Sequence, residues 1–145
     1  MGATLGYAKN TLPLSIEWAH CDPAGIVWNP RFFEFFDTGT WTLFQSVLGI
    51  PRARLNSHFG LLGLALVESG ANFTVPLAFG DSAEIESEVT EFKRSSFTVT
   101  HRITRNGKLC VDGLEKRVWA VPHPDDPQRM TTKPIPDEVI AKFRR

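Results

Sequence analysis

Cysteine is scarce in this chain of 145 residues, which contains only Cys21 and Cys110. Two cysteines are too few for a disulfide framework, so we expect a packed core and two reduced thiols. Histidine is also infrequent, and the four residues lack the spacing of metal ligands. They are His20, His58, His101 and His123. We therefore predict a protein that needs neither a metal nor a separate cofactor.

Net charge is absent as well, because 16 basic residues balance 16 acidic ones. A chain without excess positive charge gives no support for a nucleic-acid surface. No apolar run approaches the roughly 20 residues that span a bilayer, and the first ten residues lack the features of a signal peptide. We expect a cytoplasmic protein without nucleic-acid or membrane partners, folded as a single domain over residues 1–145.

Chemical information is concentrated in residues 20–33. Asp22 precedes a proline, which biases its backbone toward turn or extended conformations, and Gly25 permits a sharp change of direction. Asn29 is expected to cap a helix whose first residue is Pro30, so the unpaired N–H groups of that helix would point toward the turn. A carbonyl placed there would meet a carboxylate and a field of positive partial charge.

Hydrophobic periodicity predicts one long helix and several strands. The helix covers residues 30–48 and has one narrow polar stripe, so most of its circumference must be covered by other elements. Strands are expected over residues 14–20, 62–74 with a bulge near Gly70, 83–93, 97–103 and 108–121, the last two joined at Asn106-Gly107. Residues 52–58 are expected to be irregular. Residues 122–136 are expected to form a polar tail that precedes a short helix. This pattern predicts an α+β fold, with a curved antiparallel sheet of about five strands around one central helix.

Residues 22–28, followed by Pro30, two aromatic residues and Asp37, resemble the 4-hydroxybenzoyl-CoA thioesterase branch of the hotdog-fold acyl-CoA thioesterases. Residues 92–97 are similar to the basic turn-and-strand segment that these enzymes use near coenzyme A. The resemblance implies a hotdog fold, protomers joined edge to edge, active sites at the subunit interface and a homodimer or homotetramer. Many relatives have aspartate where this chain has His20, so no role is carried over to that position.

In the mechanism that the resemblance implies, Asp22 attacks the thioester carbonyl of an acyl-CoA substrate or directs a water onto it. The Asn29 N–H is expected to hold the oxyanion, with Gly25 and Trp28 beside the acyl group. An anionic carboxylate needs no deprotonation at neutral pH, in agreement with this role. The alternative for Asp22 is a turn-forming residue that merely ends a strand.

Further residues are assigned with alternatives left open. Asp37 borders the apolar face of the helix, where its carboxylate needs a partner that is either a substrate group or a protein donor. The basic segment is expected to bind the phosphates of coenzyme A, although such a pair is often a solvated surface; it comprises Lys93, Arg94 and Ser95. Glu68 is expected to be a structural or pocket residue and Cys21 a small buried side chain, while His20 either orients Asp22 or faces solvent.

Two other functions are compatible with the sequence. A hotdog dehydratase would need a histidine and an acid, for which His58 and Glu68 are the available pair. A non-catalytic acyl-CoA binding module would keep the basic segment without depending on Asp22. The acyl group, the choice between coenzyme A and acyl-carrier-protein thioesters, and the choice between nucleophile and general base are left open by the sequence.

Overall fold

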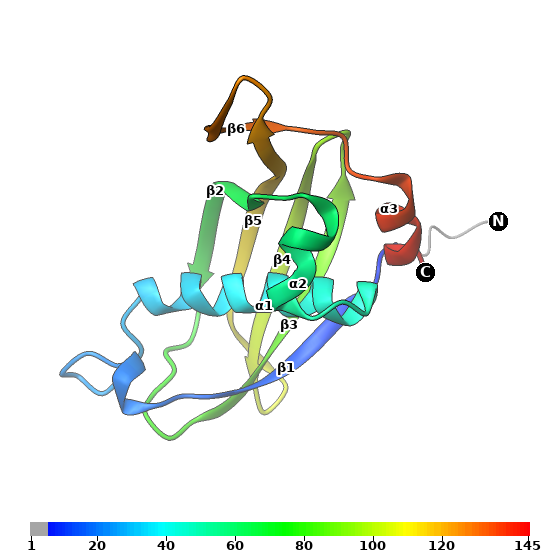
Figure 1. Ribbon diagram of the computed structural model, residues 1–145. Coiled ribbons are helices and arrows are strands. Elements are labelled where there is room, and N and C mark those ends of the chain that lie inside the picture. Colours follow the sequence, from blue (N-terminus) through cyan, green and yellow to red (C-terminus); the bar gives the residue numbers. More distant parts are fainter. Residues whose placement is uncertain (1–5) are drawn as a thin grey trace.

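A curled antiparallel sheet surrounds one long helix in the computed structural model, which describes residues 6–145 (Figure 1). The strand order is β1-β3-β4-β5-β2, and β6 pairs with the end of β5. The strands are β1 (Lys9–Ser15), β2 (Gly63–Phe73), β3 (Ser82–Phe92), β4 (Ser96–Arg105), β5 (Lys108–His123) and β6 (Asp126–Thr132). This arrangement confirms the predicted α+β hotdog-type architecture and adds one strand to it.

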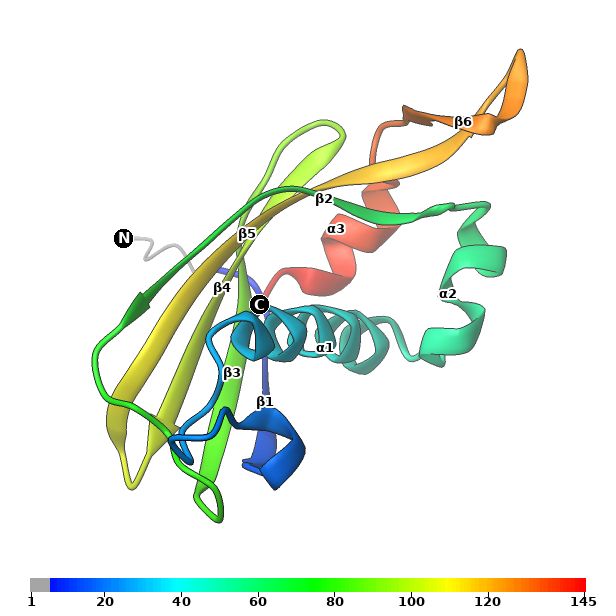
Figure 2. The ribbon, with the colours of Figure 1, turned by 90° about the vertical axis from the view of Figure 1, so that its left-hand side faces the viewer.

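Helix α1 (Pro30–Leu48) lies on the concave side of the sheet, as Figure 2 shows. Proline at its first position supplies a preset backbone and lacks the N–H that would be unpaired there. Gly49 ends the helix in the left-handed conformation, with φ of 70°, which glycine adopts without steric cost. The buried side of α1 is rich in large side chains, including Phe32, Phe36 and Phe44. The predicted limits of this helix are confirmed.

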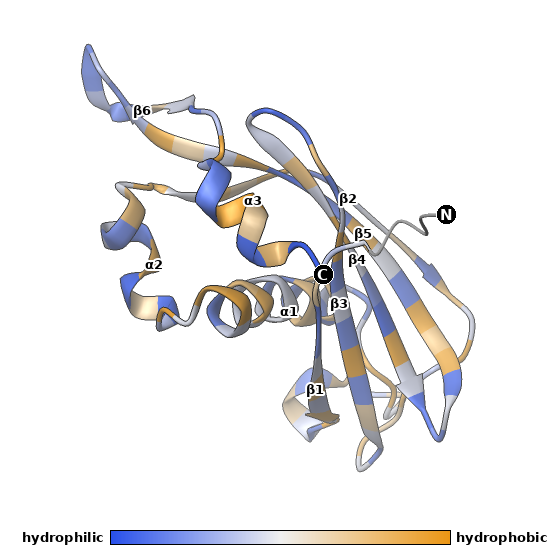
Figure 3. Ribbon diagram, turned by 90° about the vertical axis from the view of Figure 1, so that its right-hand side faces the viewer, coloured by the Kyte–Doolittle hydropathy of each residue, from blue (hydrophilic) through white to orange (hydrophobic). Residues whose placement is uncertain are grey.

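Alternating hydropathy explains why the sheet has one buried face and one solvent face. Along most of β3 and β4 every second residue is buried, and most of these residues are apolar, visible as alternating bands in Figure 3. Val89 and Val99 are paired neighbours with at most 1% of their surface exposed, and both pack in the core beneath α1. The apolar face of the sheet therefore covers the helix, as the helix pattern required.

Two further helices close the sides of this core. Helix α2 (Arg52–Phe59) occupies the stretch expected to be irregular, and that prediction is wrong because buried Leu55 anchors a short helix that ends at Gly60. Helix α3 (Asp137–Phe143) appears where a short helix was predicted. No helix among residues 6–145 is long and apolar enough to cross a membrane.

The first strand lies earlier than its alternation predicts. β1 ends at Ser15, and residues Trp18–His20 form a single 3-10 turn instead of continuing the strand to residue 20. The Ile16 N–H still donates to the carbonyl of Asp81 (2.9 Å), in register with β3. The chain then turns away from the sheet, because the His20 N–H donates to Glu17 O (3.0 Å) and the Cys21 N–H to Trp18 O (3.0 Å). This turn delivers the chain to the segment that carries Asp22.

Two other predictions of strand structure need correction. The irregularity in β2 falls between Leu66 and Glu68, not at Gly70, which pairs regularly with Leu114. The polar tail, where no strand was predicted, contains β6, which pairs with the end of β5 although its side chains are mostly exposed. An exposed edge strand needs no apolar alternation, which is why periodicity did not reveal β6.

Candidate active site

Asp22 lies in a tight turn stabilised by its own side chain. Its Oδ1 accepts the Ala24 N–H (2.8 Å), its carbonyl accepts the Gly25 N–H (2.9 Å), and its N–H donates to Ile26 O (3.0 Å). Gly25 has a φ of 81°, a conformation that disfavours a side chain. Within residues 6–145, Oδ2 of Asp22 has no hydrogen-bond donor. One carboxylate oxygen is therefore held and the other is available.

The Asn29 amide differs from the predicted capping arrangement. Asn29 occupies the N-cap position before Pro30, as predicted, but its backbone is already helical with φ of −47° and ψ of −42° and its side chain makes no capping hydrogen bond, so the capping role of the side chain is wrong. In the described part of the chain its N–H meets no backbone acceptor, whereas the Trp28 N–H is occupied by His20 O (2.9 Å). Because Pro30 has no N–H, Asn29 carries the first free donor at the start of α1. An anionic oxygen is stabilised at such a position.

The turn is tied to the loop between β2 and β3. The Val27 N–H donates to Leu77 O (2.8 Å), and the Phe79 N–H donates to Gly25 O (3.0 Å). Asp81 holds that loop, because its Oδ2 accepts the Ala78 N–H (2.8 Å) and a contact from Arg105 (2.6 Å). The Ala78 hydrogen bond, joined by Arg105, lowers the pKa of Asp81. Sequence pattern does not reveal this anchor, since Asp81 and Arg105 are 24 positions apart.

The side chains that flank Asp22 have local partners. His20 Nδ1 accepts the Glu17 N–H (2.9 Å), and its ring contacts Phe35 edge-on at 4.9 Å. Cys21 is half-buried rather than buried as expected. Trp28 is 54% exposed, and the Arg31 guanidinium lies 6.0 Å from its ring centroid. The indole therefore remains accessible beside the proposed oxyanion donor.

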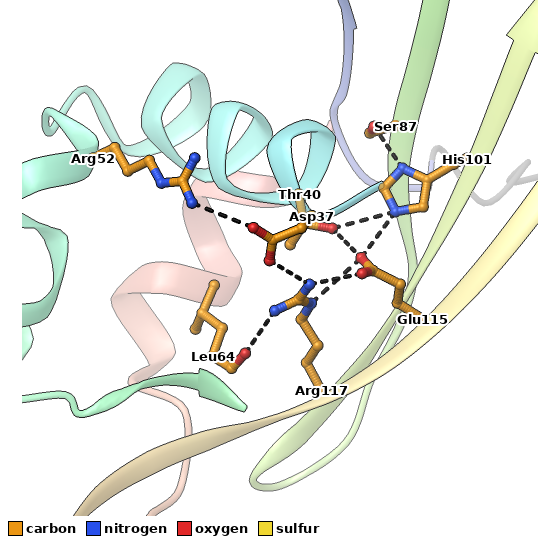
Figure 4. Close-up of polar contacts among 8 residues, drawn as sticks. All are labelled: Asp37, Thr40, Arg52, Leu64, Ser87, His101, Glu115 and Arg117. Atoms are coloured by element: carbon orange, nitrogen blue, oxygen red, sulfur yellow. Dashed lines mark hydrogen bonds and ion pairs between the residues drawn. The ribbon is translucent and has the colours of Figure 1, made fainter. Parts of the chain in front are cut away.

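Asp37 is the outer member of a polar network between α1 and the sheet (Figure 4). Its Oδ1 accepts a hydrogen bond from Arg117 (2.9 Å) and its Oδ2 accepts one from Arg52 (3.3 Å). Of the two kinds of partner expected for this carboxylate, the protein donor is therefore present. Buried Arg117 also donates to Leu64 O on β2 (2.7 Å) and to Glu115 (2.6 Å). The network thus connects α1, β5 and β2.

Glu115 and His101 form the inner part of the same network. His101 Nε2 lies 2.9 Å from Glu115 Oε1, its Nδ1 lies 2.7 Å from Ser87 Oγ, and Thr40 Oγ1 donates to Glu115. Burial would raise the pKa of Glu115, but hydrogen bonds from His101, Arg117 and Thr40 lower it to about 2. Glu115 is therefore a buried anion. Alternation along β5 does not distinguish Glu115 from a surface residue, so periodicity does not reveal it.

The predicted coenzyme A segment lies far from Asp22 in the same chain. Lys93, Arg94 and Ser95 form the turn between β3 and β4, which is fastened to β5 by the hydrogen bond from Trp119 N–H to Ser95 O (2.8 Å). The loop beside the Asp22 turn is fastened near the other end of β5, at Cys110. Nine residues of strand separate these points by about 30 Å. One protomer does not bring the two segments together.

The remaining candidates are not part of this turn. Glu68 is 59% exposed on the edge strand and pairs with Lys116 at 3.5 Å. A hollow of about 630 Å³ is lined by residues of the adjacent strands β2, β5 and β4. It shares no residue with the Asp22 turn, so the volume of a hollow does not identify the reaction site. No cluster of three metal-ligating side chains occurs among the described residues. The expectation that no cofactor is needed stays a prediction.

Comparison with known proteins places this geometry in a family. The model of the Thioesterase-like superfamily matches residues 16–143. The chain belongs to this superfamily. Among curated members, 4-hydroxybenzoyl-CoA thioesterase of Pseudomonas sp. strain CBS-3 is 29% identical over 136 residues, covering 90% of this chain and 94% of that protein. Acyl-CoA thioester hydrolase YbgC of Escherichia coli O157:H7 is 19% identical, covering 92% and 94%.

Solved structures of superfamily members agree with this assignment. The 4-hydroxybenzoyl-CoA thioesterase of the same Pseudomonas strain has a TM-score of 0.83 at 27% identity, covering 92% of this chain and 98% of that one. A gentisyl-coenzyme A thioesterase has a TM-score of 0.78 at 28% identity, covering 92% and 99%. The prediction of a hotdog-fold acyl-CoA thioesterase, and with it the thioester hydrolase class, is confirmed.

Proposed function

We propose that this superfamily member hydrolyses an acyl- or aroyl-CoA thioester, of which 4-hydroxybenzoyl-CoA is the model, to the carboxylic acid and free coenzyme A, with Asp22 as the reacting carboxylate. The observation that carries this proposal is the pairing of Asp22, with its free Oδ2, and the free N–H of Asn29 in one anchored turn. A thioester carbonyl bound at the amide develops negative charge on oxygen during attack. The helix start stabilises that charge without reorganisation.

Two routes use this geometry. In one, Asp22 Oδ2 attacks the carbonyl carbon, the carbon–sulfur bond breaks, coenzyme A leaves as thiolate, and water opens the resulting anhydride. In the other, Asp22 accepts a proton from a water whose oxygen attacks the same carbon. In both, the Asn29 N–H donates to the carbonyl oxygen. Trp28 and Gly25 flank the acyl group at the mouth of the turn.

Coenzyme A is proposed to bind at Lys93, Arg94 and Ser95. The Lys93 side chain is 68% exposed and its only ion pair among residues 6–145 is a 3.9 Å contact with Glu91, so a phosphate can recruit it. Asp37 is proposed to face the substrate as well, because its side chain stays 43% exposed beside both arginines.

We further propose a homodimer formed through β2, which the coenzyme A site requires. The outer edge of β2 is unpaired within the described chain and exposes Leu66, Val67 and Phe73, an edge that invites another strand. Antiparallel pairing of two such edges brings the end of one protomer beside the opposite end of its partner. The basic turn of one protomer would then approach the Asp22 turn of the other. Pairing of two dimers into a tetramer stays a prediction.

The cytoplasm is the proposed location. Cys21 and Cys110 are both free thiols, which suits a reducing compartment. The dehydratase alternative gains no support, because His58 packs on Phe59 in α2 while Glu68 pairs with Lys116 on β2. A binding module remains the competing function, and it differs from a thioesterase in not depending on Asp22.

Thiol release from a panel of aromatic and aliphatic acyl-CoAs tests the proposal directly. Asp22→Asn should lower release by about a hundredfold or more, as expected when a nucleophile or base is lost. Asp126→Asn is the matched control, because Asp126 also precedes a proline and its Oδ1 also accepts the N–H two residues on (3.0 Å). Equal loss in both variants, or no release by the unaltered protein, would contradict the proposal.

A further inference from the structure

His20 stands at the base of the segment that presents Asp22. Its carbonyl accepts the Trp28 N–H (2.9 Å), and two residues further on the Asp22 N–H donates to Ile26 O (3.0 Å). An isolated antiparallel bridge lies between these two bonds, so residues 20–28 form a short ribbon with the Asp22 turn at its tip. All of these contacts lie within one protomer.

The imidazole of His20 fastens this ribbon at two points. Its Nδ1 accepts the Glu17 N–H (2.9 Å), and the His20 N–H donates to Glu17 O (3.0 Å), which closes the 3-10 turn before the ribbon. Its ring contacts Phe35 of α1 edge-on, with centroids 4.9 Å apart and planes at 87°. Phe35 is 9% exposed, so the imidazole rests on a well-packed part of the helix. The side chain therefore ties the ribbon to the helix that carries the proposed oxyanion donor.

The carbonyl of His20 also determines which amide is free at the start of α1. It occupies the Trp28 N–H, and the next amide along the chain is that of Asn29. One peptide unit of about 3.8 Å separates the two residues, so a shift of His20 is passed on to Asn29. A displacement of about 1 Å in a reacting geometry can cost about a hundredfold in rate.

The hydrogen bond from the Glu17 N–H depends on the protonation state of His20. An imidazole nitrogen that accepts a hydrogen bond uses its lone pair, so the ring is neutral and carries its proton on Nε2. A proton added at Nδ1 would occupy that lone pair and face the Glu17 N–H, which leaves two donors in contact and no acceptor. The observed turn therefore requires a neutral His20.

We infer that His20 is a positioning residue: its neutral imidazole holds the Asp22 turn and the Asn29 amide in place, and its protonation releases them and lowers turnover in mild acid. The inference rests on the proposed thioesterase function, whose carboxylate and amide His20 positions. It gives this chain an acid limit on activity that is separate from the protonation of Asp22 itself.

Few other charged or titratable groups lie on the elements that pack against His20. The returning arm of the ribbon, residues 26–28, has none. On α1 the groups nearest Phe35 are Arg31 and Glu34, which pair with each other at 2.8 Å. The segment of His20 itself contributes Glu17, Cys21 and Asp22. All of these groups stay in place in a His20 variant, so a change in the pH profile of that variant reports His20.

Two substitutions separate the acceptor from the ring. His20→Phe keeps a ring against Phe35 but removes the acceptor, and should lower kcat by about tenfold or more with KM changed less than about threefold. His20→Asn places an amide oxygen on Cγ, where histidine carries Nδ1, and should recover kcat to within about threefold of the wild type. Thiol release from benzoyl-CoA and octanoyl-CoA measures both.

The pH profile tests the dependence on protonation. Between about pH 7.5 and about pH 5.5 imidazoles ordinarily gain a proton, whereas an amide does not titrate. Over this interval the wild-type kcat should fall by about fivefold or more and that of His20→Asn by less than about twofold.

Nitrogen NMR of protein with labelled histidines gives a readout that does not depend on turnover. The His20 signals, assigned by their absence from His20→Asn, should show a bare Nδ1 and a protonated Nε2 at about pH 7.5. They should gain the second proton over the same interval in which kcat falls.

His123→Phe and His123→Asn are the matched controls. The Nδ1 of His123 also accepts a backbone N–H, that of Asp125 (3.1 Å), but in the turn between β5 and β6. Both variants should keep kcat within about threefold of the wild type and should follow its pH profile.

Four results would overturn the inference. They are a folded His20→Phe with wild-type kcat, a His20→Asn that loses kcat in acid as the wild type does, a His20 ring with its proton on Nδ1 at about pH 7.5, and equal losses in the His123 variants. Each of these leaves the thioesterase proposal standing. If His20→Phe shows no thermal transition, the pH profiles and the NMR spectra decide. A wild type that releases no thiol from any acyl-CoA overturns the proposed function and this inference together.

Discussion

The amide hydrogen of Asn29 is the group on which the proposed chemistry depends, and it belongs to the backbone. Replacing Asn29 with proline removes this hydrogen at a φ of −47°, close to the value near −65° that proline imposes. We expect Asn29→Pro to lower kcat by about a hundredfold or more with little change in KM, as for loss of an oxyanion donor. Steady-state kinetics with a hydrolysed acyl-CoA would measure this.

Asn29→Ala is the companion variant, because the Asn29 side chain makes no capping hydrogen bond. It should keep kcat within about threefold of the wild type. An active Asn29→Pro, or equal losses in the two variants, would show that the oxyanion is held by another group.

Glu115 gives the protein a specific sensitivity to acid. Its folded pKa of about 2 lies below the ordinary value of 4.5, so the carboxylate contributes its full stability above about pH 4.5 and loses it as the pH falls toward 2. The contribution at neutral pH is on the order of 3 kcal/mol. Glu115→Gln should be less stable at pH 6 and should show a shallower fall of unfolding free energy between pH 4.5 and 3.

Urea unfolding at fixed protein concentration measures this, with exposed Glu138→Gln in α3 as the control. The control should follow the wild type at every pH. A Glu115→Gln protein that loses stability in acid as steeply as the wild type would contradict the assignment of Glu115 as a buried anion.

Helix α1 is seated against the sheet through a glycine. A Cβ added at Gly39 would lie 2.4 Å from Ser87 Oγ and 3.2 Å from His101 Nδ1. We therefore expect Gly39→Ala to destabilise the fold by about 1–3 kcal/mol, as overpacking does. Helix propensity alone favours alanine by about 1 kcal/mol, so the sign of the effect separates the two causes. Thermal and urea unfolding measure it.

Adding Ser87→Ala removes the nearest atom that the new methyl group meets. The double variant should recover part of the loss relative to the sum of the two single changes. Thr38→Ala, at an exposed position of the same helix, serves as the control. If Gly39→Ala were more stable than the wild type, α1 could shift away from the sheet without a loss of packing energy, which would contradict this prediction.

The elements that were predicted well are those whose ends are set by local chemistry. Pro30 and Gly49 fix α1, and Asn106-Gly107 fixes the hairpin between β4 and β5. β1 was placed too late, because apolar alternation continues through Trp18 although the backbone turns over residues 17–21, where the Glu17 N–H donates to His20 Nδ1 and the His20 N–H to Glu17 O. Apolar alternation does not report such a turn.

The same distinction applies to the candidate site. Asp22 and its turn were found because a proline and a glycine mark them in sequence. Glu115 and Arg117 have the alternation of a half-exposed strand, and only the packing of α1 shows that they are buried as an ion pair with Asp37 attached. Their burial depends on contacts between residues about 80 positions apart, which periodicity cannot supply.

The separation between the Asp22 turn and the basic turn determines how complete a lone protomer is. If each site takes Asp22 from one protomer and Lys93 and Arg94 from its partner, an Asp22→Asn protein and a Lys93→Ala/Arg94→Ala protein should be nearly inactive alone. Refolded together, half of the dimers are mixed and each has one intact site. Recovery of about a quarter of wild-type activity is expected.

The control is the same mixture without unfolding, which should stay inactive if the dimers do not exchange. Mass spectrometry of the intact complex verifies that the refolded mixture contains mixed dimers. If such a mixture recovers no activity, the shared site is contradicted. The two lesions would then lie in the same protomer's site.

The strand order also has a consequence for the time course of folding. β3, β4 and β5 are neighbours both in sequence and in the sheet, so short turns close them with little loss of chain entropy. β2 precedes these strands in sequence but pairs with β5, so it can join the sheet only after β5 has formed. The loop that anchors the Asp22 turn follows β2. We therefore expect circular dichroism to report the sheet before thiol release returns during refolding. The enzyme would gain its shape first and its activity last.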